Sequence, residues 1–181
     1  MGINQSHSIP YIYPSKIKKM TPIELIEFVN KGGHPSVFGT RDQDLQPLIG
    51  RAVGAKIIEN GSELIVYAQN ILGQHQKNLE NNAWISYTVC ELLTHITYQF
   101  KGSFLSIRKV ESVEELKWAK ENMLLFRDNF LTAGVQHLAS LVEKVNTSNL
   151  TAITFKIESI FNQTPGPKAG TQISNLETIN Q

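Results

Sequence analysis

Apolar and polar positions alternate through the middle of the chain, between Pro35 and Phe104. Alternation with a period of two is typical of strands that bury one face, and β-branched and aromatic residues supply much of it here. Turn signals such as Asn60-Gly61 separate the alternating runs and favour antiparallel hairpins. We predict five strands in this region, namely Ser36 to Thr40, Pro47 to Ile58, Leu64 to Ala68, Trp84 to Cys90 and Ile96 to Phe104.

Helical patterns precede, interrupt and follow these strands. Thr21-Pro22-Ile23-Glu24 combines an N-cap, a proline at the first helical position and a glutamate three residues after the cap, and Lys31-Gly32-Gly33 ends that helix. A short helix is expected within Ile71 to Asn82, and Ser112-Val113-Glu114-Glu115 is a second capping box. A further helix is predicted from about Asn129 to Val145. Its apolar residues recur at three-to-four spacing and are expected to form one buried stripe: Leu131, Val135, Leu138, Leu141, Val142 and Val145.

A sixth strand is predicted from Thr151 to Phe161, where apolar and polar residues alternate once more. Antiparallel strands with helices inserted as blocks indicate an α+β, mainly β, fold that closes into a small barrel. We expect residues 21–173 to form this domain, residues 1–20 to be an extended arm, and residues 174–181 to be a flexible tail.

Composition narrows the classes of function. The 181 residues, 41% of them hydrophobic, are enough for one domain with a real core. Seventeen basic against sixteen acidic side chains leave no global field for nucleic acid or an anionic membrane, so any anion site must be local. The chain carries one cysteine, and neither an apolar run of spanning length nor a secretory signal is seen, so we expect a cytoplasmic protein.

The usual catalytic and metal motifs find no support in the sequence. The five histidines show no close pairing at ligand spacing, so no metal site is expected. Cys90 lies in an alternating strand, where a small apolar side chain suits the core. No G-x-S-x-G elbow, G-x-G-x-x-G fingerprint or Walker sequence is present, which leaves hydrolase, Rossmann and P-loop assignments unsupported.

Anion-binding candidates remain at the ends of strands. Arg51 begins the segment Arg51-Ala52-Val53-Gly54-Ala55-Lys56, and Gln74, His75 and Lys77 lie in the first turns of the short helix. Helix N-termini offer free amides and partial positive charge, so these side chains can form a phosphate cradle. The alternative, that they are solvated polar residues of the surface, stays open.

The ordered segments "GRAVGAKI", "ELIVYAQN", "GQHQKNLENNAWISY" and "YQFKGSF" resemble the FMN-binding split-barrel family related to pyridoxamine 5'-phosphate oxidase. That family has an Arg-x-Val strand, an aromatic and small-residue strand, a helix ending in Glu-Asn-Asn-Pro and a Val-x-Gly strand in this order. The resemblance covers roughly residues 25 to 170. It implies a six-stranded antiparallel split barrel with peripheral helices, acting as a homodimer with FMN at the interface and a small-molecule substrate.

The resemblance also implies roles for particular residues. Arg51, Ala52, Val53 and Gly54 would line the flavin, Tyr67 and Ala68 would flank it, and Gln74, His75 and Lys77 would fall near its phosphate. Tyr67 and His75 are the nearest candidates for an acid or base. The stiff loop in Phe161 to Gly170 can shape a pocket rim with Lys168 facing an anionic ligand, or it can be a rigid exit turn with a solvated lysine.

Two departures from the family pattern keep other functions open. Gly73-Gln74-His75 stands where the family typically has Ser-Arg-Lys, and the C-terminal Arg-Leu-Ala-Pro signature of the oxidase itself is missing. Vitamin B6 oxidation is therefore not supported. The alternatives to an FMN-dependent oxidoreductase are a non-catalytic binding or sensor protein, holding haem or another ligand, and a deazaflavin-dependent reductase.

Overall fold

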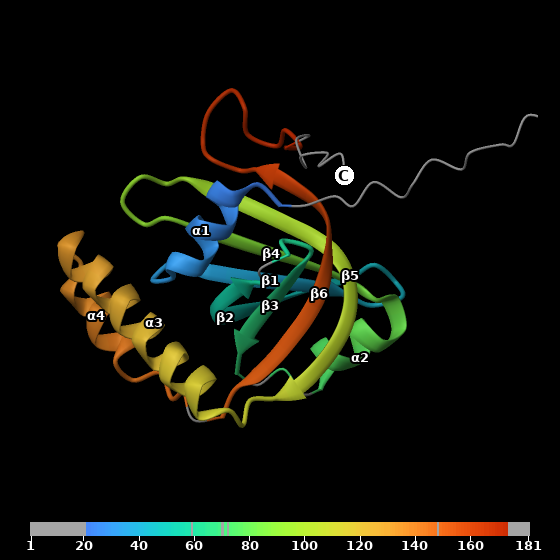
Figure 1. Ribbon diagram of the computed structural model, residues 1–181, viewed down its shortest axis with the longest axis horizontal. Helices are drawn as coiled ribbons and strands as arrows, with labels where there is room; N and C mark the ends of the chain where they lie inside the picture. Colours follow the sequence, from blue (N-terminus) through green and yellow to red (C-terminus); the bar gives the residue numbers. More distant parts are fainter. Residues whose placement is uncertain (1–20, 59, 70, 72, 148, 174–181) are drawn as a thin grey trace, which may run out of the picture.

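Six antiparallel strands close into a barrel in the order β1-β2-β3-β6-β5-β4 (Figure 1). The computed structural model describes residues 21–173 except 59, 70, 72 and 148, so the expected arm and tail lie outside the described residues. The α+β class and the six-stranded barrel predicted from the sequence are confirmed. The strands are β1 (Ser36–Arg41), β2 (Pro47–Ile57), β3 (Glu63–Ala68), β4 (Trp84–Cys90), β5 (Thr97–Lys109) and β6 (Thr151–Asn162).

The last strand, β6, closes the barrel because it pairs with β3 along one edge and with β5 along the other. The pairing of β5 with β6 has two register shifts, at Lys101/Gly102 and at Phe104/Ser106. Such bulges bend a strand and increase its twist, as a small closed barrel requires. At Gly102 the backbones come so close that a side chain would collide with the carbonyl oxygen of Lys156.

Large apolar side chains from every strand fill the barrel. Phe38, Leu64, Tyr87, Phe100 and Phe155 are each at most 2% exposed. Because side chains alternate along a strand, the residues on either side of these point outward, toward a helix or toward solvent. The core positions thereby determine which residues remain on the outer surface for binding.

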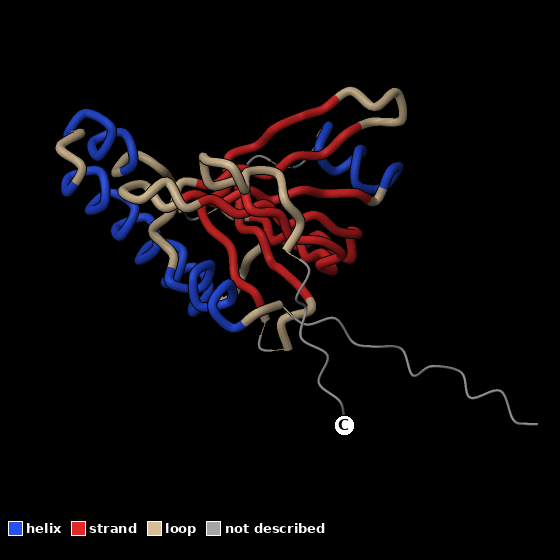
Figure 2. Tube along the Cα trace, turned by 90° about the horizontal axis from the view of Figure 1, so that it is seen from above, coloured by secondary structure: helices blue, strands red, loops and turns tan. Residues whose placement is uncertain are grey.

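In the described part of the chain, four helices surround the barrel: α1 (Ile23–Lys31), α2 (Gln74–Asn82), α3 (Val113–Thr132) and α4 (Gln136–Val142). The α3–α4 pair lies on one side of the barrel and α2 on another, as both overall views show (Figures 1 and 2). A second core forms beneath α3, where Val53 and Tyr67 pack with Ala119 and Met123. None of the described helices is both long and apolar enough to cross a membrane.

Of the two predicted N-caps, one is confirmed and one is wrong. The Ser112 hydroxyl accepts a hydrogen bond from the backbone amide of Glu115 at 3.3 Å, as expected. Thr21 does not cap α1, because its hydroxyl instead donates to the carbonyl of Gly61 at 2.6 Å. The helix begins at Ile23 without a side-chain cap. A tertiary contact with the β2–β3 turn has therefore displaced the local one.

The predicted helix from Asn129 to Val145 is also wrong. α3 continues to Thr132, and a short α4 follows after Gly134, whose φ of 74° breaks the helix. The expected buried stripe is interrupted as a result, and Leu131 and Leu141 are 47% and 58% exposed. Strand β5 is likewise longer than predicted and runs on to Lys109.

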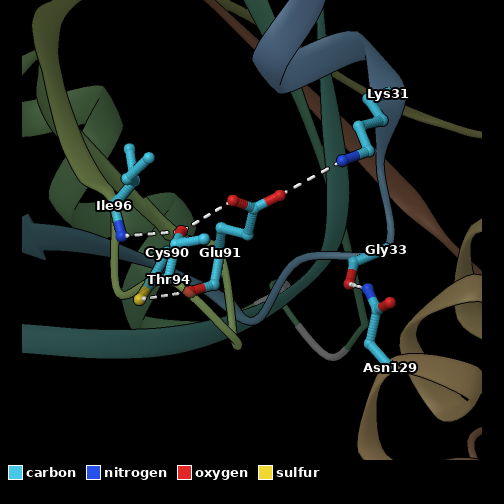
Figure 3. Close-up of polar contacts among 7 residues, drawn as sticks. All are labelled: Lys31, Gly33, Cys90, Glu91, Thr94, Ile96 and Asn129. Atoms are coloured by element: carbon cyan, nitrogen blue, oxygen red, sulfur yellow. Dashed lines mark hydrogen bonds and ion pairs between the residues drawn. The ribbon is translucent and has the colours of Figure 1, made fainter. Parts of the chain in front are cut away.

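Two asparagines of α3 fasten the α1–β1 linker to the barrel. The side-chain oxygen of Asn122 accepts from the amide of Gly33 at 2.7 Å, and its side-chain nitrogen donates to the carbonyl of Val53. Asn129 donates to the carbonyl of Gly33 at 2.7 Å (Figure 3). A side chain at Gly32 would collide with Asn122, so the Gly-Gly pair permits this close approach.

We predict that Asn122→Ala lowers the free energy of unfolding by about 2–4 kcal/mol, because it leaves two buried backbone groups without partners. Urea denaturation followed by circular dichroism measures the change. Lys120→Ala, at an exposed position of the same helix, is the matched control and should change stability by less than about 0.5 kcal/mol. Equal stability of the two variants would show that Asn122 does not fasten the linker.

Candidate functional site

Three of the residues expected to line a flavin, Val53, Gly54 and Tyr67, are packed beneath α3, whereas Arg51 is exposed and Ala52 and Ala68 pack in or against the barrel core. Tyr67 is 1% exposed and Val53 is 7% exposed. The hydroxyl of Tyr67 donates to Glu115 at 2.7 Å, and its ring lies against Trp118 with 4.9 Å between centroids. A side chain at Gly54 would collide with Asn122. In this structure, therefore, the helix covers this part of β2 and β3.

The electrostatics of this region make Tyr67 a fixed hydrogen-bond donor. Burial raises the pKa of Tyr67 above its usual range, and the neighbouring Glu115 carboxylate raises it further. Arg108 pairs with Glu115 at 2.6 Å and holds the pKa of that carboxyl below its usual range. Tyr67 thus stays protonated near neutral pH, with its hydroxyl committed to fastening α3. Its predicted acid–base role has no structural support in this arrangement.

His75 also belongs to an internal hydrogen-bond network. Its Nδ1 lies 3.0 Å from the hydroxyl of Thr40, and Asn78 donates to the same hydroxyl at 3.1 Å. Gln74 in turn donates to Asn78 at 2.8 Å. Burial lowers the pKa of His75 and favours the neutral ring. The predicted cradle residues Gln74 and His75 therefore attach α2 to β1, whereas Lys77 is exposed.

Lys168 lies at the other end of the barrel from α2. Thr97, the first residue of β5, pairs with Cys90, and its carbonyl accepts from the amide of Gln163 at 2.8 Å, which places the loop of residues 163–171 at that end of β4. Helix α2 leads into β4 at Trp84, the opposite end. Seven residues of strand span about 20 Å, so Lys168 and α2 do not meet within one subunit. The site assignments made from the sequence stay predictions.

The outward surface of β2, β1, β4 and β5 offers an accessible alternative, which we call the open sheet face. Val37, Ile49 and Trp84 on it are 38%, 70% and 46% exposed. Strand pairing places its outward residues in adjacent rows. One row is Arg51, Val37, Thr88 and Gln99, and the next is Ile49, Gly39, Ser86 and Lys101.

A groove of about 460 Å³ crosses the open sheet face at Gly39. A side chain at Gly39 would come within 2.8 Å of the Ser86 hydroxyl, so the absence of one leaves the groove open. We call this hollow the Gly39 groove. Its lining is Gly39, Thr40, Arg41, Pro47, Leu48, Ile49, Trp84, Ile85, Ser86 and Lys101.

The open sheet face is basic as well as apolar. Arg51, Arg41 and Lys101 lie on it, and none of them forms an ion pair within the described part of the chain. Lys101 lies over the ring of Phe161, 4.5 Å from its centroid, and Arg41 makes a long hydrogen bond of 3.4 Å to Asn82. Three cations without carboxylate partners beside exposed apolar side chains favour an anion with an apolar body.

Comparison with solved structures identifies the architecture. HupZ of Group A Streptococcus matches over 83% of this chain and 100% of its own, with 20% identity and a TM-score of 0.50. The chain has the split-barrel fold. Other split-barrel neighbours are an FMN-binding protein of Syntrophomonas wolfei (11% identity, 80% of this chain and 84% of that one, TM-score 0.46) and the haem storage protein HutZ of Vibrio cholerae (16%, 77% and 92%, TM-score 0.38).

The split-barrel resemblance seen in the sequence is confirmed at the level of the fold, and its neighbours include FMN-binding proteins. No protein-family model matches the sequence, and no curated protein matches it significantly. A fold does not by itself determine which ligand a protein binds.

One buried polar group, His34, was missed by the sequence analysis. It is 5% exposed and stacks on Phe28 with 4.7 Å between ring centroids. Neither ring nitrogen has a hydrogen-bond partner among the described residues. Burial lowers the pKa of His34, while nearby Glu91 raises it and Lys31 lowers it by smaller amounts. Glu91 is itself held by Lys31 at 3.1 Å and by Thr94 at 2.6 Å (Figure 3).

We predict that acid destabilises the protein through His34. The unfolded chain binds a proton near pH 6.5, whereas the folded chain binds it only at lower pH, so stability falls as the pH drops below 6.5. The slope contributed by one such group is at most about 1.4 kcal/mol per pH unit. His34→Phe should reduce that slope, measured by urea denaturation between about pH 7.5 and 5.5. The exposed His137→Phe control should keep the wild-type slope, and an unchanged slope in His34→Phe would refute the assignment.

Proposed function

We propose that the chain is a cytoplasmic FMN-binding flavoprotein that works as a homodimer and acts as an oxidoreductase. The observation that carries this proposal is the open sheet face, where exposed Arg51 stands beside exposed Val37 and Ile49. A flavin nucleotide needs an apolar surface for its ring system and cations for its phosphate, and this face supplies both.

The exposed apolar side chains of this face support the dimer. Val37 and Ile49 lie on the neighbouring strands β1 and β2, and apolar side chains grouped on a surface mark binding or association sites. A flat ring lying on a sheet is covered on one side only, so a second copy packed over it would exclude water from the other side.

In this proposal the protein binds and orients, and the flavin carries the redox chemistry. Bound FMN supplies hydride or electron transfer. Arg51 would neutralise the phosphate, and Val37 and Ile49 would support the ring edge. Tyr67 and Val53 contribute indirectly, because their packing under α3 fixes the position of β2. We assign no acid or base.

The structure of α2 favours a second candidate function, a split-barrel protein that binds haem, deazaflavin or another ligand. Helix α2 begins after Gly73 without the family's Ser-Arg-Lys run, and Gln74 and His75 are already engaged with Asn78 and Thr40. Only Lys77 remains as a cation in its first turns. The protein would bind FMN less tightly if Arg51 were the only side chain that held its phosphate.

We predict that FMN binds the purified chain and that Arg51→Gln weakens this binding by roughly tenfold, because a charge-assisted contact to phosphate is lost. Quenching of flavin fluorescence measures the affinity. Lys109→Gln, which removes an exposed charge elsewhere on the barrel, should leave it unchanged.

Sedimentation tests the dimer in parallel. Val37→Asp places a charge in the proposed interface and should shift the protein toward monomer and lower its affinity for FMN. A monomeric wild-type chain that ignores FMN would refute the proposal. Haem or deazaflavin titration followed by visible absorbance would then test the second candidate.

A further inference from the structure

The lining of the Gly39 groove includes none of the positions that the resemblance assigned to FMN, and it meets the flavin surface proposed above only at Ile49. Its volume of about 460 Å³ falls within the usual range for small-molecule pockets, roughly 300–1,000 Å³. We propose that this groove binds a planar aromatic anion, such as an aryl carboxylate or sulfonate. The assignment of this anion as a substrate rests on the proposed flavin function. The proposal that the groove binds it does not depend on that function.

An aromatic body is favoured by the shape of the groove and by its apolar lining. The indole of Trp84, on β4, is 46% exposed and lines one side of the groove. Ile49, on β2, is 70% exposed and lines the other side. Gly39 between them contributes no side chain, so a flat group can reach the sheet backbone. Aromatic rings pack face to edge or offset on an indole, which gives a planar ligand more contact than a branched aliphatic one.

A negative charge is favoured by the ionised side chains of the lining. Arg41 and Lys101 are its two charged residues, and neither has a carboxylate partner in the part of the chain that the structure describes. The carboxylates nearest to Arg41 in sequence and to Lys101 in the strand pairing already have other hydrogen-bond partners. Asp42 accepts from the amide of Gln46 at 2.8 Å, and Glu158 is held by Ser103 at 3.1 Å and by Lys156 at 3.3 Å.

The groove also provides hydrogen-bond donors for the ligand's anionic group. Lys101 lies on the same row as Gly39 and Ser86, and Arg41 lies two residues along β1 from Gly39. The cations thus flank the hollow from β5 and from β1. One anionic group can meet either cation while the ring system rests against Trp84, and the Ser86 hydroxyl is available beside it.

The test compares two probes that share an aromatic body and differ in charge. 8-Anilinonaphthalene-1-sulfonate carries a sulfonate, whereas N-phenyl-1-naphthylamine is neutral. Both become fluorescent in apolar sites and are titrated into the full chain without flavin. We expect one sulfonate site per chain, with affinity at least about tenfold above that of the neutral probe. Equal affinities would overturn the proposal.

Variants locate the site. Lys101→Gln and Arg41→Gln should each weaken sulfonate binding by roughly five- to tenfold, and Trp84→Leu should weaken both probes. Lys117→Gln on α3, whose side chain is 74% exposed, is the matched charge control and should bind as the wild type does. Loss of binding in Lys117→Gln equal to that in Lys101→Gln would overturn the assignment.

Two further measurements keep the result decisive. Near-ultraviolet circular dichroism identifies any variant whose side-chain packing is lost. In a Trp118→Phe variant the tryptophan fluorescence comes from Trp84 alone, so its quenching reports binding without altering the groove. Sulfonate binding that survives in a chain indifferent to FMN would support the groove and refute the flavin proposal. FMN binding without sulfonate binding would refute the groove alone.

Discussion

The double pairing of β6 is the constraint on which the rest of the structure depends. This strand is the last of the described strands, yet it joins β3 to β5 and so turns two separate edges into one closed sheet. Closure assigns every strand residue to the inside or the outside, since a shift of one position would exchange the two faces. The buried row at Phe38, Tyr87 and Phe100 and the accessible row at Gly39, Ser86 and Lys101 follow from the same register.

Closure also explains which outer surfaces remain available. The α3–α4 pair is inserted between β5 and β6, and α3 covers Val53 and Tyr67. Asn122 completes this cover by bonding both to Val53 on β2 and to Gly33 ahead of β1. The α1–β1 linker is thus held to α3, while Val37 and Ile49 on β1 and β2 stay exposed.

The strands could be predicted from sequence because alternation is a local signal, and β4 was placed at its observed bounds. Contacts between distant residues could not be predicted. Thr21 was predicted to cap α1 because a local pattern favours it, but a hydrogen bond to Gly61 prevails. The unbroken helix across Gly134 failed because a three-to-four spacing can continue through a residue that takes a positive φ. His34 has no local signal, since burial decides its chemistry.

The candidate site shows the same limit. The resemblance selected residues by their order in the sequences of β2 and β3. That order does not determine which of these residues a helix covers. Only Arg51 among the predicted β2 and β3 residues is exposed, whereas Gly39, Trp84 and Lys101 come from three strands, and the sequence predicted no binding role for any of them.

What brings those three residues together is the pairing of β1 with β4 and of β4 with β5. A ligand bound there would contact four strands at once, so its affinity would depend on the pairing of β2, β1, β4 and β5 more than on any single element. Binding at the Gly39 groove should therefore stabilise the protein against unfolding, because unfolding separates the strands that form the groove.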